Sequence, residues 1–336
     1  RGPGAIMVHA FDGGRDLPEM IGAAALILLA VAAAASDTIA DRLWMWGTPS
    51  GFKNVWAKYL SSPSGTRRTR ITAVESAWFI GTPNLFFFYE DTHAQCASSN
   101  FTQCDIIDGS DAANRSLPIY AVPMKSMRSV AFGATYSAPI PPWLWPAIWD
   151  LFSDPDLHVA GVCVDDYPYD DAASLAALKA RMLAAAAAAG RTAAKLFSTV
   201  YTWDVGKPGI EPFLALIDAP ILWTWDSTQL NATMNQTFPA FERLTGPGRM
   251  LGIYAYDFGF LDGNQSDPAC KHLHPPDCHG RPMPSDTMQR QLAWALGLLE
   301  QGRIAGIAFE GIFDLGLPAV TVLRAWVQEV GGRLVG

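Results

Sequence analysis

Short, continuous apolar segments recur along the chain after residue 40. They are rich in β-branched and aromatic residues and lack the apolar–polar alternation of a strand with one solvated face. Each is therefore typical of a parallel strand that is covered on both faces. Eight segments have this pattern: residues 42–47, 84–90, 129–136, 158–166, 195–204, 220–226, 250–259 and 303–311.

Helical patterns separate several of these segments, most clearly over residues 170–190, 284–302 and 317–330. Strand–helix–strand units with right-handed crossovers build a parallel sheet, and eight of them fit a closed (β/α)8 barrel. We therefore predict an α/β fold, a TIM barrel, as a single domain over residues 36–336. An open doubly wound sheet is the alternative, but no G-x-G-x-x-G follows the first strand and no Walker motif occurs.

Residues 21–35 form an uncharged apolar run, IGAAALILLAVAAAA. This run is shorter than the roughly 20 residues that span a membrane, and the small residues after it suit a signal-peptidase site. We expect residues 1–35 to be a leader that is removed near Ser36, so that the protein is secreted and has no membrane contact afterwards. A buried Ala-rich helix and an uncleaved signal anchor are the alternatives.

Five of the seven asparagines lie in N-x-S/T sequons, within polar stretches between apolar ones. Sequons are acceptors for N-glycosylation in the secretory pathway, so this pattern predicts an exported glycoprotein. Sequons that occur by chance in polar loops are the alternative. The five are Asn100, Asn114, Asn231, Asn235 and Asn264.

Four of the five cysteines form two pairs with a spacing of eight residues, Cys96 with Cys104 and Cys270 with Cys278. Both pairs lie in long loop-like segments, where local disulfides would pin the chain in an oxidising compartment. The remaining Cys163 lies in an apolar strand and is predicted to be a buried thiol.

The second pair of cysteines also allows a metal site. The run CKHLHPPDCH places His272, His274 and His279 beside these cysteines, a ligand set for zinc or copper. Its spacing matches no standard zinc finger, so we favour the disulfide and predict neither a metal nor a cofactor.

The composition changes this picture in two ways. Half of the residues are hydrophobic and 17% are charged, which excludes a disordered chain. A net charge of −8 argues against a nucleic-acid partner, which would need clustered Lys and Arg. We expect a monomer.

Acidic residues follow the predicted strands repeatedly. A barrel carries its active site at the carboxyl ends of its strands, so these acids should gather around one mouth. Crowding and partial burial there raise the pKa of one carboxyl, which then acts as a general acid beside an ionised partner. Helix capping and Asx-turns are the structural alternatives, and Asp204 in particular can start a turn. The candidate catalytic residues are Asp165, Asp166, Asp226, Asp257 and Glu310.

Aromatic residues accompany these acids, while no G-x-S-x-G or H-E-x-x-H occurs, which argues against a serine triad and a zincin. Paired carboxylates cleave glycosidic bonds, and aromatic rings stack on sugar rings. Alternation along a strand predicts that Trp44 and Trp46 share one face, although packing between barrel and helices is the alternative. The candidate substrate-binding residues are Trp44, Trp46, Tyr167, Trp203, Trp225 and Tyr256.

Three segments carry a family resemblance: GVCVDDYP at 161–168, PILWTWDS at 220–227 and GIYAYDFG at 252–259. With residues 281–309 and 314–320, they resemble uncharacterised secreted or bacterial proteins that have a glycoside-hydrolase-like (β/α)8 barrel. The resemblance covers roughly residues 158–330. It implies the barrel and, as an expectation, a glycosidase whose acids are Asp165, Asp166, Asp226 and Asp257. Glu310 departs from that pattern.

Our leading hypothesis is a secreted glycoside hydrolase that cleaves a poly- or oligosaccharide. Asp165 or Asp166 would be nucleophile or base and Asp226 the general acid, with Asp257 or Glu310 tuning them. One alternative is a carbohydrate-binding barrel without catalysis. The other is a metal-dependent hydrolase in which Asp165, Asp166 and Asp257 hold a divalent cation through their oxygens.

Overall fold

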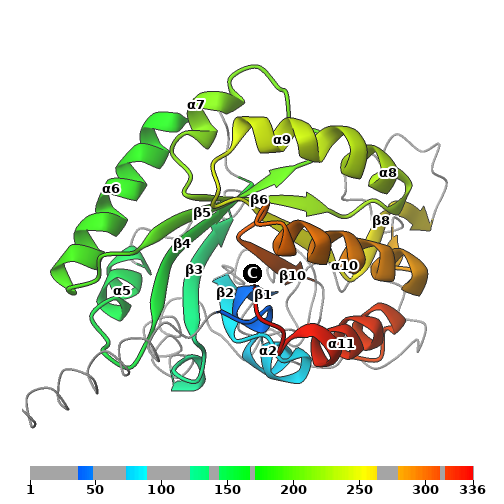
Figure 1. The fold of residues 1–336 in the computed structure, drawn as a ribbon. Coiled ribbons are helices and arrows are strands. Elements are labelled where there is room, and N and C mark those ends of the chain that lie inside the picture. The colour runs from blue at the N-terminus through cyan, green and yellow to red at the C-terminus, as the bar shows by residue number, and fades with distance from the viewer. Residues whose placement is uncertain are drawn as a thin grey trace, which may run out of the picture. The chain divides into compact units, whose positions relative to one another are not determined.

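Eight parallel strands close into a barrel in the order β1-β10-β7-β6-β5-β4-β3-β2 (Figure 1). Each of the eight predicted apolar segments coincides with one of these strands, with β6 beginning one residue before its segment, so the predicted TIM barrel is confirmed. The strands are β1 (Leu43–Gly47), β2 (Asn84–Phe88), β3 (Ser129–Thr135), β4 (Val159–Asp165), β5 (Lys195–Tyr201), β6 (Ala219–Thr224), β7 (Met250–Tyr254) and β10 (Gly306–Glu310).

This computed structural model describes residues 37–47, 73–88, 122–135, 144–166, 171–262, 279–310 and 315–335. The predicted leader, the two predicted cysteine pairs, and Asn100, Asn114, Asn264 and Tyr167 lie outside the described residues, so these remain predictions. Cys163 is buried and free, as predicted, and burial raises the pKa of its thiol well above the ordinary value. Among the described helices, none is both long and apolar enough to cross a membrane.

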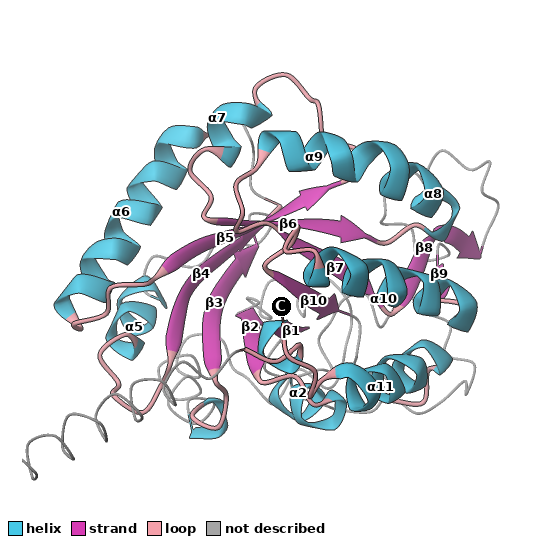
Figure 2. Cartoon of the chain, in the orientation of Figure 1, coloured by secondary structure: helices cyan, strands magenta, loops and turns pink. Residues whose placement is uncertain are grey.

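The helices lie around the outside of the strands (Figure 2). The three predicted helices are present as α6, α10 and α11. The helical elements are η1 (Ala40–Arg42), α2 (Ala73–Ile80), α5 (Leu144–Leu151), α6 (Ala172–Ala188), α7 (Ile210–Leu214), η3 (Ser227–Gln229), α8 (Leu230–Ala232), η4 (Thr233–Thr237), α9 (Phe238–Leu244), α10 (Ser285–Glu300) and α11 (Pro318–Val330).

The seventh apolar segment is two strands, not one, and the break lies at Ala255. The Ala255 N–H donates to the Glu310 carbonyl (2.8 Å), and the Ala255 carbonyl accepts from the Met283 N–H (2.9 Å). Beyond Ala255 the chain leaves the barrel as β8 (Tyr256–Asp262), which pairs antiparallel with β9 (His279–Pro282). An apolar run alone could not reveal this break, because both parts favour extended backbone.

Large aromatic rings fill the barrel interior, and glycines on neighbouring strands make room for them. Trp223 is paired in register with Gly252, and Phe88 with Gly133. A Cβ at Gly252 would lie 2.2 Å from the Trp223 ring, and one at Gly133 would lie 2.4 Å from the Phe88 ring. Each of these rings therefore requires a position without a side chain beside it.

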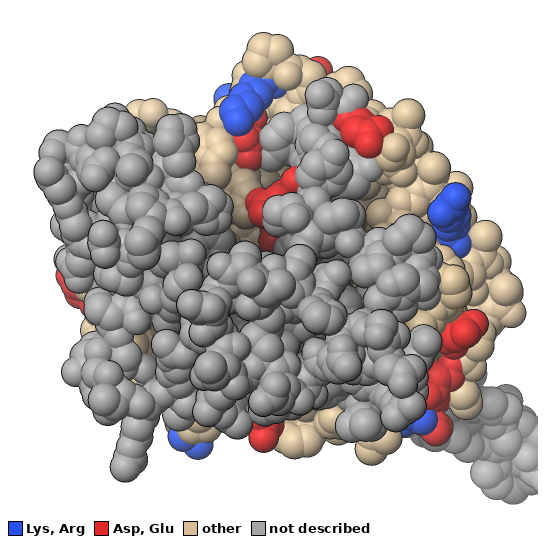
Figure 3. Space-filling model, turned by 180° about the vertical axis from the view of Figure 1, so that it is seen from behind, with Lys and Arg blue, Asp and Glu red and all other residues tan. Residues whose placement is uncertain are grey.

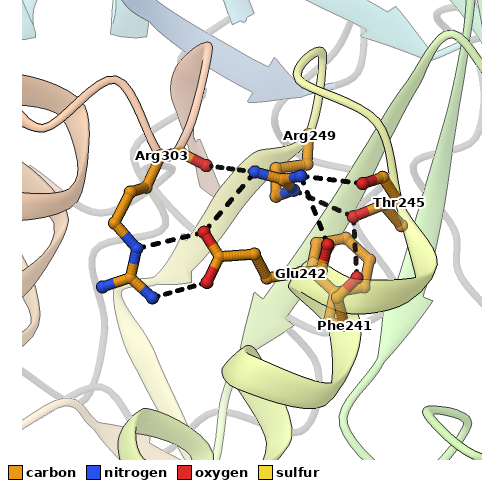
Figure 4. Close-up of polar contacts among 5 residues, drawn as sticks. All are labelled: Phe241, Glu242, Thr245, Arg249 and Arg303. Atoms are coloured by element: carbon orange, nitrogen blue, oxygen red, sulfur yellow. Dashed lines mark hydrogen bonds and ion pairs between the residues drawn. The ribbon is translucent and has the colours of Figure 1, made fainter.

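An arginine pair ties α9 to the amino ends of β7 and β10 (Figure 4). Arg249 donates to the carbonyls of Thr245 (2.7 Å), Glu242 (3.3 Å) and Arg303 (2.9 Å), and it thereby satisfies carbonyls at the end of α9. Arg303 donates through Nε (3.0 Å) and an amino group (2.6 Å) to the two carboxylate oxygens of Glu242. The hydrogen bond from Arg303 lowers the pKa of Glu242, while burial acts in the opposite direction.

We predict that Gly252→Ala destabilises the barrel by about 1–3 kcal/mol, because its methyl group would overlap the Trp223 ring. Urea unfolding measures the change. Gly297→Ala is the matched control, since that glycine lies within α10 with no atom near its Cβ position. The control should be neutral or more stable by up to about 1 kcal/mol. Equal effects of the two substitutions would contradict the register requirement.

We also predict that Glu242→Gln lowers stability at neutral pH by about 1 kcal/mol or less, as expected for a partly exposed pair. The folded-state pKa of Glu242 is lowered. The contribution of Glu242 to the free energy of unfolding is therefore fully present above its pKa in the unfolded chain, about 4.3. It is lost as the pH falls through its lower pKa in the folded protein. Thermal unfolding from pH 7 to pH 3 should show the two proteins converging in acid. A constant difference would argue against the ion pair.

Candidate active site

In four strands the last residue whose side chain faces the barrel interior is polar. Residues two and four positions before each of them mostly belong to the barrel interior, such as Cys163 and Phe197. Alternation along a strand therefore directs the last residues inward as well, at the carboxyl end of the barrel. These residues are Asp165 of β4, Tyr201 of β5, Tyr254 of β7 and Glu310 of β10.

Asp166 joins this group through an unusual backbone conformation. Its neighbour Asp165 faces inward, so a regular strand would direct Asp166 outward. Instead Asp166 has a φ of 52°, in the left-handed region, and is the only described non-glycine residue with a positive φ. The Asp166 N–H donates to Asp165 Oδ1 (3.1 Å) and to Thr199 Oγ1 (3.3 Å). Backbone strain at a strand end is typical of functional sites.

Thr199 and Tyr201 of β5 hold the two aspartates. Thr199 Oγ1 donates to Asp165 Oδ1 (2.7 Å), and the Tyr201 hydroxyl donates to Asp166 Oδ1 (2.7 Å). Desolvation raises the pKa of Asp166, and the negative charge of Asp204 adds to this, while the Tyr201 hydrogen bond lowers it. Part of the Asp166 surface nevertheless remains open to solvent. Asp166 is thus a carboxyl group that keeps its proton more readily than an ordinary aspartate.

Tyr254 pairs with Glu310 and lies within range of the aspartate charges. Tyr254 and Glu310 are paired in register on neighbouring strands, and Glu310 is buried with 8% of its surface exposed. Burial raises the pKa of Tyr254 well above its ordinary value, and the charge of Glu310, the charge of Asp165 and a hydrogen bond with Glu310 raise it further. Burial and the same aspartates also raise the pKa of Tyr201. Both tyrosines therefore stay protonated and can donate to carboxylates.

An aromatic wall continues from these tyrosines, and we define it as Tyr201, Trp203, Trp225 and Tyr254. The Tyr201 and Trp203 rings are stacked with centroids 4.6 Å apart and planes within 6°. Trp225 lies 4.7 Å from Trp203 and 6.5 Å from Tyr254, so the wall reaches from β5 to β7. Trp203 has 47% of its surface exposed and can offer a ring face to a ligand.

Three other aromatic residues that were predicted to bind substrate, Trp44, Trp46 and Tyr256, are packed against other side chains of the protein. Trp44 stacks on Phe86 (4.5 Å) and Trp46 on Phe88 (3.7 Å), both inside the barrel, so the two tryptophans share one face as alternation predicts. Tyr256 lies after the break at Ala255 and is buried in the core between barrel and helices. The structure does not bring these three rings into the aromatic wall.

Two predicted acids accept hydrogen bonds from the turn η3. Asp226 caps the turn η3, where its Oδ1 accepts from the Thr228 N–H (2.8 Å) and hydroxyl (2.5 Å). Asp257 is fully buried and accepts from the Ser227 N–H (3.0 Å) and hydroxyl (2.6 Å). The capping alternative describes Asp226, whereas the contacts of Asp257 go to a residue 30 positions earlier in the chain and are not those of a local Asx-turn.

Within the described part of the chain, no group of three or more His, Cys, Asp and Glu side chains is placed to hold a metal ion. Asp165, Asp166 and Asp257 thus do not form the cation site of the metal-dependent alternative. Figure 3 shows the molecule from behind, with several Asp and Glu side chains visible in the upper middle of that face.

Sequence reasoning missed Tyr201, Tyr254 and Thr199 as site residues. The signal was present, because each lies two or four residues after an interior position of its own strand. Counting this alternation to the end of each strand would have found them.

No family model matches the chain, and no curated protein matches it. A glycoside hydrolase-like protein of known structure is 11% identical with a TM-score of 0.53, over 88% of this chain and 96% of that one. A GH18 chitinase from Cycas revoluta, solved with (GlcNAc)3, is 10% identical with a TM-score of 0.44, over 84% and 99% of the two chains. A GH18 chitinase from Flavobacterium johnsoniae is 11% identical with a TM-score of 0.45, over 88% and 95%. At these identities the likeness is one of barrel fold.

We predict that Asp166→Asn stabilises the protein at pH 7. A raised folded-state pKa means that ionising Asp166 costs stability as the pH rises from the unfolded pKa, about 3.9, through the folded value. Asn removes this cost, can still accept from Tyr201 and tolerates the left-handed backbone. Thermal unfolding from pH 3 to pH 8 should show a gain that fades in acid.

Asp154→Asn is the matched control for this measurement. Its Lys125 partner, 2.9 Å away, lowers the pKa of Asp154, so the sign is reversed. This substitution should reduce stability at pH 7. If both variants changed stability in the same direction, desolvation of Asp166 would not be the cause.

Proposed function

We propose that the protein is a glycoside hydrolase that acts at the carboxyl end of its barrel, with a poly- or oligosaccharide as substrate. The observation that carries this proposal is one cluster of groups. Asp166, whose pKa is raised, lies beside Asp165, the Tyr254–Glu310 pair lies within range of their charges, and the aromatic wall includes the tyrosine that donates to Asp166. Cleavage of a glycosidic bond needs a carboxylic acid and a second carboxylate on one substrate.

Asp166 is suited to the role of general acid, because its raised pKa keeps a proton available to the leaving oxygen. Asp165 and Glu310 are the candidates for the carboxylate that acts as nucleophile or base. Thr199 and the Asp166 N–H orient one oxygen of Asp165, and Tyr254 orients Glu310. This assignment differs from the sequence-based one, in which Asp226 was the acid.

The aromatic wall supports a sugar as the ligand. The ring centroids of Trp203 and Trp225 lie 4.7 Å apart at the same end of the barrel as the carboxylates. Aromatic side chains hold pyranoses by stacking on their ring faces. The barrel shared with a glycoside hydrolase-like protein is compatible with this chemistry. Barrels host many reactions, so the argument rests on the side chains.

The test is hydrolysis of a panel of polysaccharides by the wild type and by single variants. We predict that Asp166→Asn and Glu310→Gln each lose about 100-fold or more in kcat/KM, because each removes an acid–base or nucleophilic group. Glu242→Gln is the control, since it removes a carboxylate from the other end of the barrel and should retain activity.

Three outcomes would change the proposal. Loss of activity in Asp226→Asn alone would restore Asp226 as the general acid. Binding of a polysaccharide by every variant without turnover would favour the carbohydrate-binding barrel. Full activity in Asp166→Asn and Glu310→Gln would remove the proposed site.

We further propose that the protein is exported and N-glycosylated. Two of the predicted acceptors are described, Asn231 in α8 and Asn235 in η4, and both are exposed. We expect the protein to lose mass on endoglycosidase treatment after expression in a eukaryotic secretory host. Asn231→Gln and Asn235→Gln should each reduce this loss by the mass of one glycan. Masses that do not differ from the wild type would show that these two sequons are not used.

A further inference from the structure

The turn after β5 is built around Asp204, a carboxylate with only 3% of its surface exposed. Its Oδ2 accepts from the Tyr201 N–H (3.3 Å), and its Oδ1 pairs with Lys207 Nζ (2.6 Å). The backbone follows the same path, because the Asp204 N–H donates to the Tyr201 carbonyl (2.9 Å) and the Lys207 N–H to the Asp204 carbonyl (3.0 Å). One side chain therefore holds both ends of the turn.

This turn carries two groups of the proposed site. Tyr201, at its start, donates to Asp166 Oδ1 (2.7 Å). Trp203, within the turn, stacks on Tyr201 and meets Trp225. Since Asp204 is bonded to the backbone of Tyr201 and directly follows Trp203, the same support fixes the partner of Asp166 and the exposed part of the aromatic wall.

A buried charge is a costly way to close a turn. Without Lys207 the carboxylate of Asp204 would lack its ion pair, and an uncharged turn residue would avoid most of the desolvation cost. The negative charge of Asp204 has a second effect, because it raises the pKa of Asp166, although less than desolvation does.

The other described groups that act on Asp166 come from three strands. Asp165 of β4 precedes it, Tyr201 of β5 donates to it, and Tyr254 of β7 lies close enough for the Asp166 charge to raise the pKa of Tyr254. None of these is a cation.

We propose that Asp204, held by Lys207, is a positioning residue of the active site: it fixes Tyr201, the hydrogen-bond partner of Asp166, and Trp203 of the aromatic wall. This inference deepens the proposed function and rests on it. Asp204 itself is not a reacting group, since it is bonded to the turn through both oxygens.

The first test is the pH profile of kcat/KM on the polysaccharide that the panel identifies. In Asp204→Asn the alkaline limb should move to lower pH by about half a unit or more, because removing a negative charge eases ionisation of Asp166. Lys207→Arg should keep the wild-type profile. A wild-type profile in Asp204→Asn would overturn the proposal.

Lys179→Met is the matched control for loss of a lysine–aspartate pair. Lys179 Nζ contacts Asp218 Oδ1 at 2.7 Å just before β6, at the amino end of the barrel. Its loss should leave the pH profile unchanged. A shifted profile in this control would show that any lost ion pair has the same effect, and would also overturn the proposal.

Lys207→Met tests the support of the aromatic wall, and it covers the case in which Asp204→Asn fails to fold. Lys207 is half-exposed, so its removal opens no cavity in the core, while the Asp204 carboxylate loses this ion pair. With the turn released, KM should rise about 3- to 10-fold, and the near-UV circular dichroism of the Tyr201–Trp203 stack should weaken. Unchanged values of both would contradict a role in positioning the wall.

A last measurement needs no substrate. The stabilisation by Asp166→Asn is followed from pH 3 to pH 8 in the wild-type and in the Asp204→Asn background, and in the latter it should fade at lower pH. If this shift occurs without any hydrolysis in the panel, the positioning role stands and the proposed function fails. In the opposite case, Asp166→Asn abolishes hydrolysis, but Asp204→Asn changes neither the pH profile of kcat/KM nor the pH at which the stabilisation by Asp166→Asn is lost. The proposed function then stands and this inference fails.

Discussion

The strict alternation of inward and outward side chains in a closed barrel is the constraint on which the rest of this structure depends. Along the strands the lower inward positions hold apolar side chains or glycines, and large rings lie opposite glycines, as the Trp223–Gly252 pair shows. The last inward position of four strands is polar instead, with a carboxylate or a tyrosine. The same row thus supplies the packed interior at one end and the polar cluster of the proposed site at the other.

Part of this arrangement could be predicted from the sequence. Continuous apolar runs are a strong signal, and all eight strands follow from them. The direction of a side chain beyond a strand end depends on local backbone, which composition does not encode. Asp226 follows Trp225 and caps η3, whereas Asp166, in a left-handed conformation, accepts a hydrogen bond from Tyr201 of the cluster. Asp257 lies beyond the break at Ala255 and follows no barrel row.

The two ends of the barrel treat charge differently. At the amino end, Arg249 and Arg303 surround Glu242 and give each charge an opposite partner. At the carboxyl end, Asp165, Asp166 and Glu310 have hydroxyl groups as partners, and Asp166 ionises at a cost. A site that needs a proton-holding acid gives up stability that other parts of the fold must supply.

The excursion that begins at Ala255 is closed at its own base. The chain leaves after Ala255 and returns at Met283, and the hydrogen bond between these two residues joins the ends of the excursion directly. Ala255 is also bonded to the carbonyl of Glu310, so the exit point is fixed on the barrel itself. A loop whose ends already meet changes length at little entropic cost. This hairpin is accordingly a natural place for grafting or shortening, where the rim can be rebuilt while the strand register is kept.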